Sequence, residues 1–448
     1  MHMTKNKLTK IEFAKALKRG HGRALIHVEQ HGLCGISELV LSACLKDPSY
    51  DKQLESSRVK WLFKMFCDDE NLPNFSIAIL KALSIETELY DLQQLCEFAE
   101  LLAKKGNTKA HDLLCKIVLN QPLPDGQWPY GTHELVALNG VGAVVAIARR
   151  FGALLLRNPP ERPAWLGHFF DDIPAAKRKV TKLAKTDAAI NAFLQNQKRQ
   201  KVNCAEDDQK KKLKANNAGA HFEKELTPED FADHAFAEIS KEDNSFQTRI
   251  SNRRLAGLAS SESLNFLLDR LNGETNDAVI VRFLRAFIFI KLPQTHPVLW
   301  KLVESRDWEV RNAAINILAN IQEHRIGELG RSKLRSENFA EADVHFIELL
   351  SENFKSQDDR LILSALKRTA LSDDLAHGVG FAIDRMYEAN DSLASAGLLK
   401  WNYEHNPCTE CRCRTVELMI ERRVMTPEIA MECRYDSNEE IRKLVQEN

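Results

Sequence analysis

The sequence predicts an all-α protein. Leu, Ala, Glu and Lys dominate its composition, and the helix breakers Gly and Pro number only 19 and 14 among 448 residues. Apolar residues recur at the spacing of one helix face over most of the chain, and the alternating pattern of a half-buried strand is hard to find. A chain of this length exceeds one compact core, so we expect either several domains or repeats that pack only on their neighbours.

The N-terminal part predicts helices joined by short turns. Residues 9–120 carry helical patterns with breaks at Gly20 and Gly32. Antiparallel helices with short links are typical of helical bundles and solenoids. Residues 121–131 are rich in Pro and Gly and predict an irregular loop, because proline lacks a backbone donor and glycine permits turns.

The middle of the chain changes character. Helices are expected over 133–156, 161–171 and 174–197. Residues 198–226 carry almost no apolar side chain, so they cannot bury enough surface to order themselves and predict a linker or long loop. Thr227 and Pro228 then suit a helix start, and helical patterns continue to the C-terminus. The expected parts are an N-terminal helical domain (1–197), a charged linker (198–226) and a C-terminal helical-repeat domain (227–448).

The strongest helical signal is the run Asp307-Trp-Glu-Val310-Arg311-Asn-Ala-Ala-Ile-Asn-Ile-Leu-Ala. Asp307 is placed to cap the helix, where its carboxylate accepts free N–H groups and suits the helix dipole. Val310 begins an apolar face that continues at helical spacing. Arg311 lies beside the cap, where we expect it to pair with an acid of a neighbouring repeat. Looser copies begin near 276, 358 and 438, which indicates a degenerate repeat.

These residues resemble the second helix of a HEAT repeat. The resemblance covers about 227–448 and, more weakly, 9–197, and the phrase Asn406-Pro-Cys408-Thr-Glu-Cys411 is similar to ones in uncharacterised bacterial HEAT-repeat proteins. It implies a HEAT-like (armadillo-type) α-solenoid, a right-handed superhelix of antiparallel helix pairs with a long mid-chain loop. Proteins of this superfamily mostly bind other proteins, a minority bind nucleic acid, and a few, such as the alkylpurine glycosylases, are enzymes.

Composition and motifs favour an interaction scaffold. The net charge of −1 gives no global attraction to nucleic acid or anionic membranes. No P-loop, G-x-S-x-G, kinase or Ser-His-Asp pattern is present, and no carboxylate is singled out by an apolar setting, so no catalytic residue or cofactor is expected. A glycosylase-like enzyme is a lesser alternative. Without a signal peptide or an apolar run of spanning length, and with ten cysteines best explained as reduced thiols, we expect a cytoplasmic protein that binds another protein and no membrane.

The cysteines near the C-terminus form the first candidate site. Cys408 and Cys411 have the spacing of two zinc ligands, and Cys413, Cys433 or His405 can complete a tetrahedral set. The simpler interpretation is a helix start after Pro407, with structural thiols and no metal. A redox pair is the third alternative, because a helix N-terminus favours a thiolate.

Basic residues in the region 177–212 form the second candidate site, an alternative nucleic-acid-binding surface. Clustered cations of this kind can contact phosphates. A solvated helix face and loop explain the same residues, and aromatic residues for base stacking are nearly absent. The residues concerned are Lys177, Arg178, Lys179, Lys182, Lys210, Lys211 and Lys212.

Two weaker patterns have structural explanations. His27 and His31 share a helix face, but Gly32 follows at once, so His31 suits a helix C-terminus. Gly140 and Gly142 resemble part of a dinucleotide-binding turn, but no βαβ unit surrounds them, and small residues in an apolar helix permit close helix packing.

Overall fold

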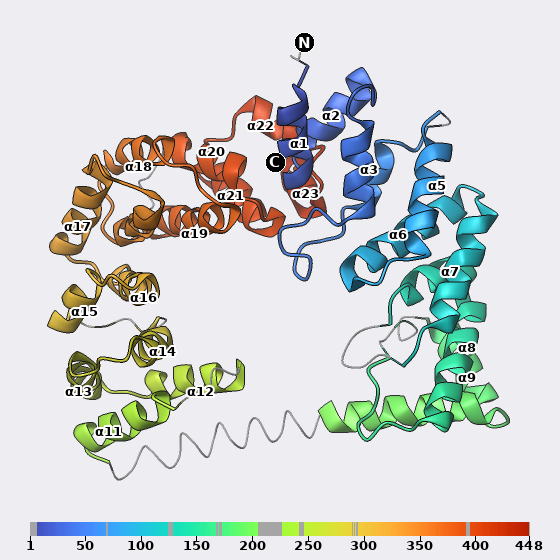
Figure 1. The fold of residues 1–448 in the computed structure, drawn as a ribbon, viewed down its shortest axis with the longest axis horizontal. Helices are drawn as coiled ribbons and strands as arrows, with labels where there is room; N and C mark the ends of the chain where they lie inside the picture. The colour runs from blue at the N-terminus through green and yellow to red at the C-terminus, as the bar shows by residue number, and fades with distance from the viewer. Residues whose placement is uncertain are drawn as a thin grey trace. The chain divides into compact units, whose positions relative to one another are not determined.

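Every regular element that the structure describes is a helix, which confirms the all-α prediction (Figure 1). The structure is a computed structural model. It describes residues 7–447 apart from 69, 124–128, 167–168, 170–172, 205–225, 242–245, 289, 291, 293 and 391–394. The chain forms two compact units: the first holds residues 1–213 and 431–446, and the second holds 214–430 with the last two residues.

The first unit is built around the long helices α6 and α8. Both of them pack on α7, and α6 also contacts α3, α4 and α5. Its helices are α1 (Lys10–Arg19), α2 (Gly22–His31), α3 (Ser37–Leu45), α4 (Val59–Lys64), α5 (Leu72–Leu83), α6 (Leu89–Lys104), α7 (Thr108–Asn120), α8 (Thr132–Arg157), α9 (Pro174–Leu183), a helix over residues 188–204, and α23 (Glu439–Glu447).

The C-terminal segment 431–446 packs on the N-terminal helices of this unit, and Figure 1 shows α23 beside α1. The Ser437 N–H donates to the carbonyl oxygen of Gly20 at 2.9 Å, and the indole N–H of Trp61 donates to that of Tyr435 at 2.8 Å. A side chain at Gly22 would overlap the backbone of Glu432, so this close approach requires glycine. The expected domain limits placed 431–446 with the C-terminal part, whereas these long-range bonds join it to the N-terminal helices.

The second unit contains two series of neighbouring helices. In the first series, α12 packs on α14, α14 on α16, α16 on η1, η1 on α19 and α19 on α21. In the second series, α11 packs on α13 and α13 on α15, while α17 packs on α18 and α18 on α20. The helices are α11 (Pro228–Ile239), α12 (Phe246–Gly257), α13 (Ser261–Asn272), α14 (Asp277–Phe287), α15 (Pro297–Leu302), α16 (Trp308–Leu318), α17 (His324–Arg335), the 3₁₀ helix η1 (Glu341–Leu350), α18 (Asp358–Lys367), α19 (Asp373–Ala389), α20 (Ala396–His405) and α21 (Thr409–Glu421); α22 (Pro427–Cys433) leads back to the first unit.

The helix expected after Asp307 is α16. The Asp307 carboxylate accepts the backbone N–H of Val310 at 2.9 Å, and the Val310 side chain is fully buried. Arg311 differs from its expectation: its guanidinium donates to the carbonyl oxygens of Ser305 and Ala342, at 3.1 and 3.4 Å, rather than pairing with an acid. Carbonyls at the ends of neighbouring elements need donors, and the arginine supplies two of them.

The expected helix 174–197 is broken, and the helix that follows is longer than expected. Residues 184–187 form a turn, and the Asp187 carboxylate accepts the N–H groups of Ala189 and Ile190 at the next helix start. That helix continues to residue 204, seven residues into the expected linker, with Asn196 bonded to the backbone of Ala164. The rest of the expected linker, 205–225, lies outside the described residues.

In the part of the chain that the structure describes, one helix is long and apolar enough to cross a membrane, which corrects the expectation from the sequence that no segment is. Helix α8 has 26 residues, and 44% of its most apolar window of 18 residues is buried. It is kinked at Gly140, where φ is 54°, and it packs on α6, α7 and α9. These contacts are those of a core helix.

Replacement of Asp307 by Ala should lower the free energy of unfolding of the second unit by about 1 kcal/mol, because the first turn of α16 loses its side-chain acceptor. Chemical denaturation would measure the change. Asp307→Asn keeps an acceptor oxygen and should stay close to the original stability. Equal unfolding of the Ala variant and the original protein would show that the cap contributes nothing.

Candidate functional site

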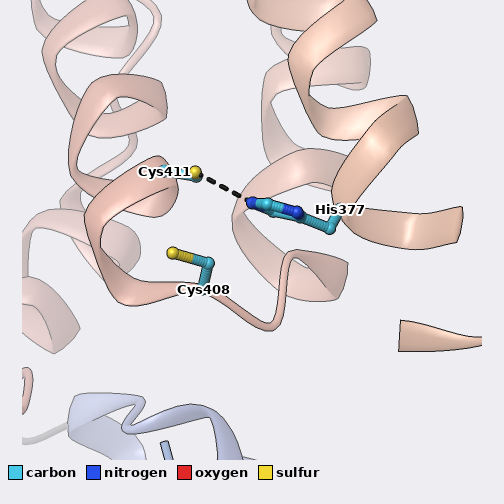
Figure 2. A group of neighbouring side chains, drawn as sticks. All are labelled: His377, Cys408 and Cys411. Carbon is cyan, nitrogen blue, oxygen red and sulfur yellow. Dashed lines mark hydrogen bonds between the residues drawn. The ribbon is translucent and has the colours of Figure 1, made fainter. Parts of the chain in front are cut away.

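Three metal-binding side chains converge where α19 meets α21. His377 lies in the second turn of α19, Cys408 is the N-cap residue of α21, and Cys411 lies in the first turn of α21. Figure 2 shows the Cys411 thiol pointing to the imidazole, with Cys408 at the same helix start. One donor atom from each residue lies within 4.8 Å of the other two, and Nε2 of His377 is 3.1 Å from Sγ of Cys411.

The local sequence explains why the two thiols lie together. Asn406 and Pro407 end the extended link after α20, and the Asn406 side chain accepts the N–H of Cys408 at 3.1 Å. The N-cap residue and the residue three positions later lie on the same side of a helix start, as they do in a capping box. Cys408 is 5% exposed, and Cys411 and His377 are half-buried.

A glycine lets α20 approach α19 beneath this cluster. A Cβ at Gly380 would overlap the side-chain amides of Asn402 and Asn406, which are both fully buried. Asn402 donates to the Gly380 carbonyl oxygen at 3.2 Å, and Asn406 donates to the amide oxygen of Asn402 at 3.1 Å. The cluster therefore rests on a polar layer whose geometry depends on the absence of a side chain at position 380.

The same layer contains a buried carboxyl group. Asp384 accepts from Asn402 at 3.0 Å and from the Thr415 hydroxyl at 3.3 Å. Burial raises the pKa of Asp384 to about 7, against the opposing effect of these two hydrogen bonds. In the first unit, burial likewise raises the pKa of Glu134 to about 7, and burial raises that of its neighbour Glu97. These groups correct the expectation that no carboxylate has an apolar setting.

Two of the five predicted metal ligands lie in the cluster. Cys408 and Cys411 belong to the cluster, whereas the His405 ring stacks on Trp401 with centroids 4.6 Å apart and its Nδ1 lies 2.9 Å from the Trp401 carbonyl oxygen. Cys413 is buried and is not in the donor group, and Cys433 ends α22 in the segment that belongs to the first unit.

His377 is the residue that sequence reasoning missed. It lies 34 positions before Cys411 and carries no motif of its own. Only the packing of α19 on α21 brings it to the thiols. Two thiols and one imidazole can bind a soft or borderline metal ion, and the thiols alone can form a disulfide.

The structure brings part of the predicted basic region to one surface, and its role there stays a prediction. Lys177, Arg178 and Lys182 line an open depression along α9, together with Thr181 and Lys185. Lys179 is exposed but does not line it. Lys210, Lys211 and Lys212 lie outside the described residues.

The two weaker patterns have structural roles. Nδ1 of His27 accepts the N–H of Leu8 at 3.3 Å, and the His27 ring packs against Phe13 and His31. Burial lowers the pKa of His27. Gly140 forms the kink of α8, and no strand precedes it among the described residues.

A scan against protein-family models matches no family, and searches of curated proteins and of solved structures find no match. The geometry of these residues therefore carries the functional argument.

Asp384→Asn should make the second unit more stable at pH 8 than the original protein, and the gain should shrink as the pH falls towards 4. The pKa of Asp384 in the folded state, about 7, lies above its ordinary 3.8. Stability from the protonated carboxyl is therefore complete below the ordinary value and is lost as the pH rises through 7. A shift of one pKa unit between the folded and unfolded states corresponds to about 1.4 kcal/mol of folding free energy. Urea unfolding at several pH values would measure the difference.

The exposed carboxyl of Glu421, on α21, provides the control. Glu421→Gln should leave the pH dependence unchanged, since this side chain is 55% exposed. A pH-independent difference between Asp384→Asn and the original protein would contradict the assignment.

Proposed function

We propose that the second unit is a HEAT-like α-solenoid and that the protein is a scaffold that binds another protein, without catalysis of its own. The observation that supports this most is a repeated bond between successive helices, made by Asn320, Asn353 and Asn390, here called the asparagine ladder. Its regularity is typical of repeat architectures, in which each unit contacts its neighbours in the same way.

Each step of the asparagine ladder has the same form. Asn320 follows α16 and donates to the carbonyl oxygen of Ile288, just after α14, at 2.9 Å. Asn353 follows η1 and donates to that of Ile321, after α16, at 2.9 Å. Asn390 ends α19 and donates to that of Ser351, after η1, at 3.2 Å. Each amide also donates to the carbonyl four residues earlier in its own helix.

A second repeated feature lies at the helix starts. Arg311, four residues after the cap Asp307, donates to the carbonyl oxygen six residues before it. Arg442, four residues after the cap Asn438, also donates to the carbonyl oxygen six residues before it. The two stretches that resemble each other in sequence therefore share a local structure, which supports a common repeat.

Two exposed aromatic side chains indicate where a protein partner would bind. Trp308 on α16 is 58% exposed, and Phe381 on α19 is 52% exposed. Both helices belong to the series α12–α14–α16–η1–α19–α21. Large aromatic residues are enriched at protein interfaces, and Trp above all at the positions that dominate affinity. We therefore propose that this series carries the binding surface. We also propose a reducing, cytoplasmic setting, which suits a chain with ten cysteines.

Affinity capture from a lysate of the source organism, followed by mass spectrometry, tests the scaffold. The original protein should enrich a specific partner, and Trp308→Ala with Phe381→Ala should release it. Truncation of a dominant interface residue costs about 2 kcal/mol, roughly thirtyfold in Kd. Ile77→Ala with Ile85→Ala removes apolar side chains of the first unit that are even more exposed, and it should retain the partner. Equal capture by both double variants would contradict the proposed surface.

A second candidate function, the binding of nucleic acid through phosphate contacts, rests on the depression along α9. Four of its five lining side chains are cationic, and none is acidic. Clustered cations attract a phosphate backbone and release its counterions. The surface offers no aromatic side chain for base stacking, so it would bind without sequence preference.

Fluorescence anisotropy with labelled DNA and RNA at rising salt tests this candidate. Binding should weaken steeply with salt, and Lys182→Ala should lower the slope of log K against log salt by about 1. Lys179→Ala removes a cation of the same helix outside the depression and serves as the matched control. Absence of binding at low salt, or equal slopes for both variants, would exclude the α9 surface as the binding site.

A further inference from the structure

We propose that His377, Cys408 and Cys411 form a binding site for Zn²⁺ and supply three of its ligands. The proposal rests on the convergence of three donor atoms from two helices (Figure 2). It goes beyond the scaffold function and does not depend on it. It also replaces the simpler interpretation of the two cysteines as structural thiols, which does not account for the approach of His377 to both of them.

The spacing of the donors fits the ion. Zn–N bonds of about 2.05 Å and Zn–S bonds of about 2.3 Å in a tetrahedron separate N from S by about 3.6 Å and S from S by about 3.8 Å. The three donor atoms lie within 4.8 Å of one another, and the His377–Cys411 pair is 3.1 Å apart. Side-chain rotations that move the donor atoms by less than about 1 Å would therefore complete the coordination.

The surroundings hold the donors in place. The N–H of Cys408 is bonded to Asn406, which is itself bonded to Asn402 against Gly380. The His377 ring meets Phe381 edge-on, with centroids 4.7 Å apart, and this contact orients the imidazole. Ligands whose orientation is fixed by neighbouring groups bind a metal more tightly.

The donor atoms of this cluster determine which metal ion it prefers. Sulfur and imidazole donors suit Zn²⁺ and disfavour Mg²⁺ and Ca²⁺, which prefer oxygen. The positive end of the helix dipole at the start of α21 favours negative charge on both thiols. Two thiolates neutralise the charge of the ion, and binding releases the two thiol protons.

Metal analysis of the full chain tests the proposal. The protein would be produced with added zinc, freed of any tag and passed through gel filtration. We expect one zinc per chain, and zinc should fall well below that in His377→Ala and in Cys408→Ser with Cys411→Ser. Titration of the reduced, metal-free protein with Co²⁺ avoids dependence on variants: it should give tetrahedral absorption with thiolate-to-cobalt charge transfer.

Two matched variants serve as controls. Cys115→Ser removes a thiol that also approaches a histidine, with its Sγ 3.8 Å from Nε2 of His111. Among the described residues, Cys115 belongs to no group of three metal-binding side chains. His405→Ala removes the histidine nearest in sequence to the two cysteines. Both should keep the full zinc content. Circular dichroism would confirm that the site variants are folded. Lack of zinc in the original protein together with no cobalt signal, or full zinc in folded His377→Ala, would overturn the proposal.

Discussion

The second unit depends on how its helices satisfy their last carbonyl groups. The final four carbonyls of a helix have no donor within the helix, and leaving them unpaired away from water is costly. Asn320, Asn353 and Asn390 solve this for two helices at once, because a side-chain amide has two N–H groups. One binds a carbonyl of the residue's own helix, and the other binds a carbonyl that follows an earlier helix of the series. The ladder therefore fixes the spacing of α14, α16, η1 and α19, and it positions α19 for the cluster above Gly380.

Where α19, α20 and α21 meet, several polar side chains are buried between the helices. Asn402 and Thr415 are fully buried, and both bond to Asp384. A buried network of this kind is favourable only when its members find partners, since the same low dielectric that strengthens its bonds penalises a missing one. Asp384 avoids part of the cost of burying a charge, because it keeps its proton at a pH where exposed carboxyl groups have lost theirs. Polar specificity and close packing thus occupy the same helix face as the thiol–imidazole cluster.

Local signals were predictable from the sequence, and contacts between distant helices were not. Asp307 acts as the expected cap and Val310 is buried as expected, because capping and apolar periodicity depend on a few adjacent residues. The CxxC spacing made Cys408 and Cys411 a candidate pair, and their Sγ atoms lie within 4.8 Å of each other. His377 and the asparagine ladder could not be found this way, because an isolated His or Asn in a helical pattern has many uses and its partner lies more than 30 residues away. Arg311 is predicted to pair with an acidic side chain, but it donates to backbone carbonyls instead, because tertiary packing decides which acceptors lie within its reach.

The two cysteines and the histidine would contribute unequally to a metal-stabilised fold. Cys408 and Cys411 are three residues apart, so an unfolded chain can still offer both thiolates to an ion. Binding stabilises the folded state only by the difference between its affinities for the folded and unfolded chains. His377 is separated from the thiols by a helix hairpin and joins them only after α19 packs on α21. The imidazole therefore carries the coupling between metal binding and folding, while the thiols supply most of the affinity in either state. The start of α21 positions the two cysteines, and the packing of α19 on α21 adds the histidine, which the unfolded chain does not hold beside them.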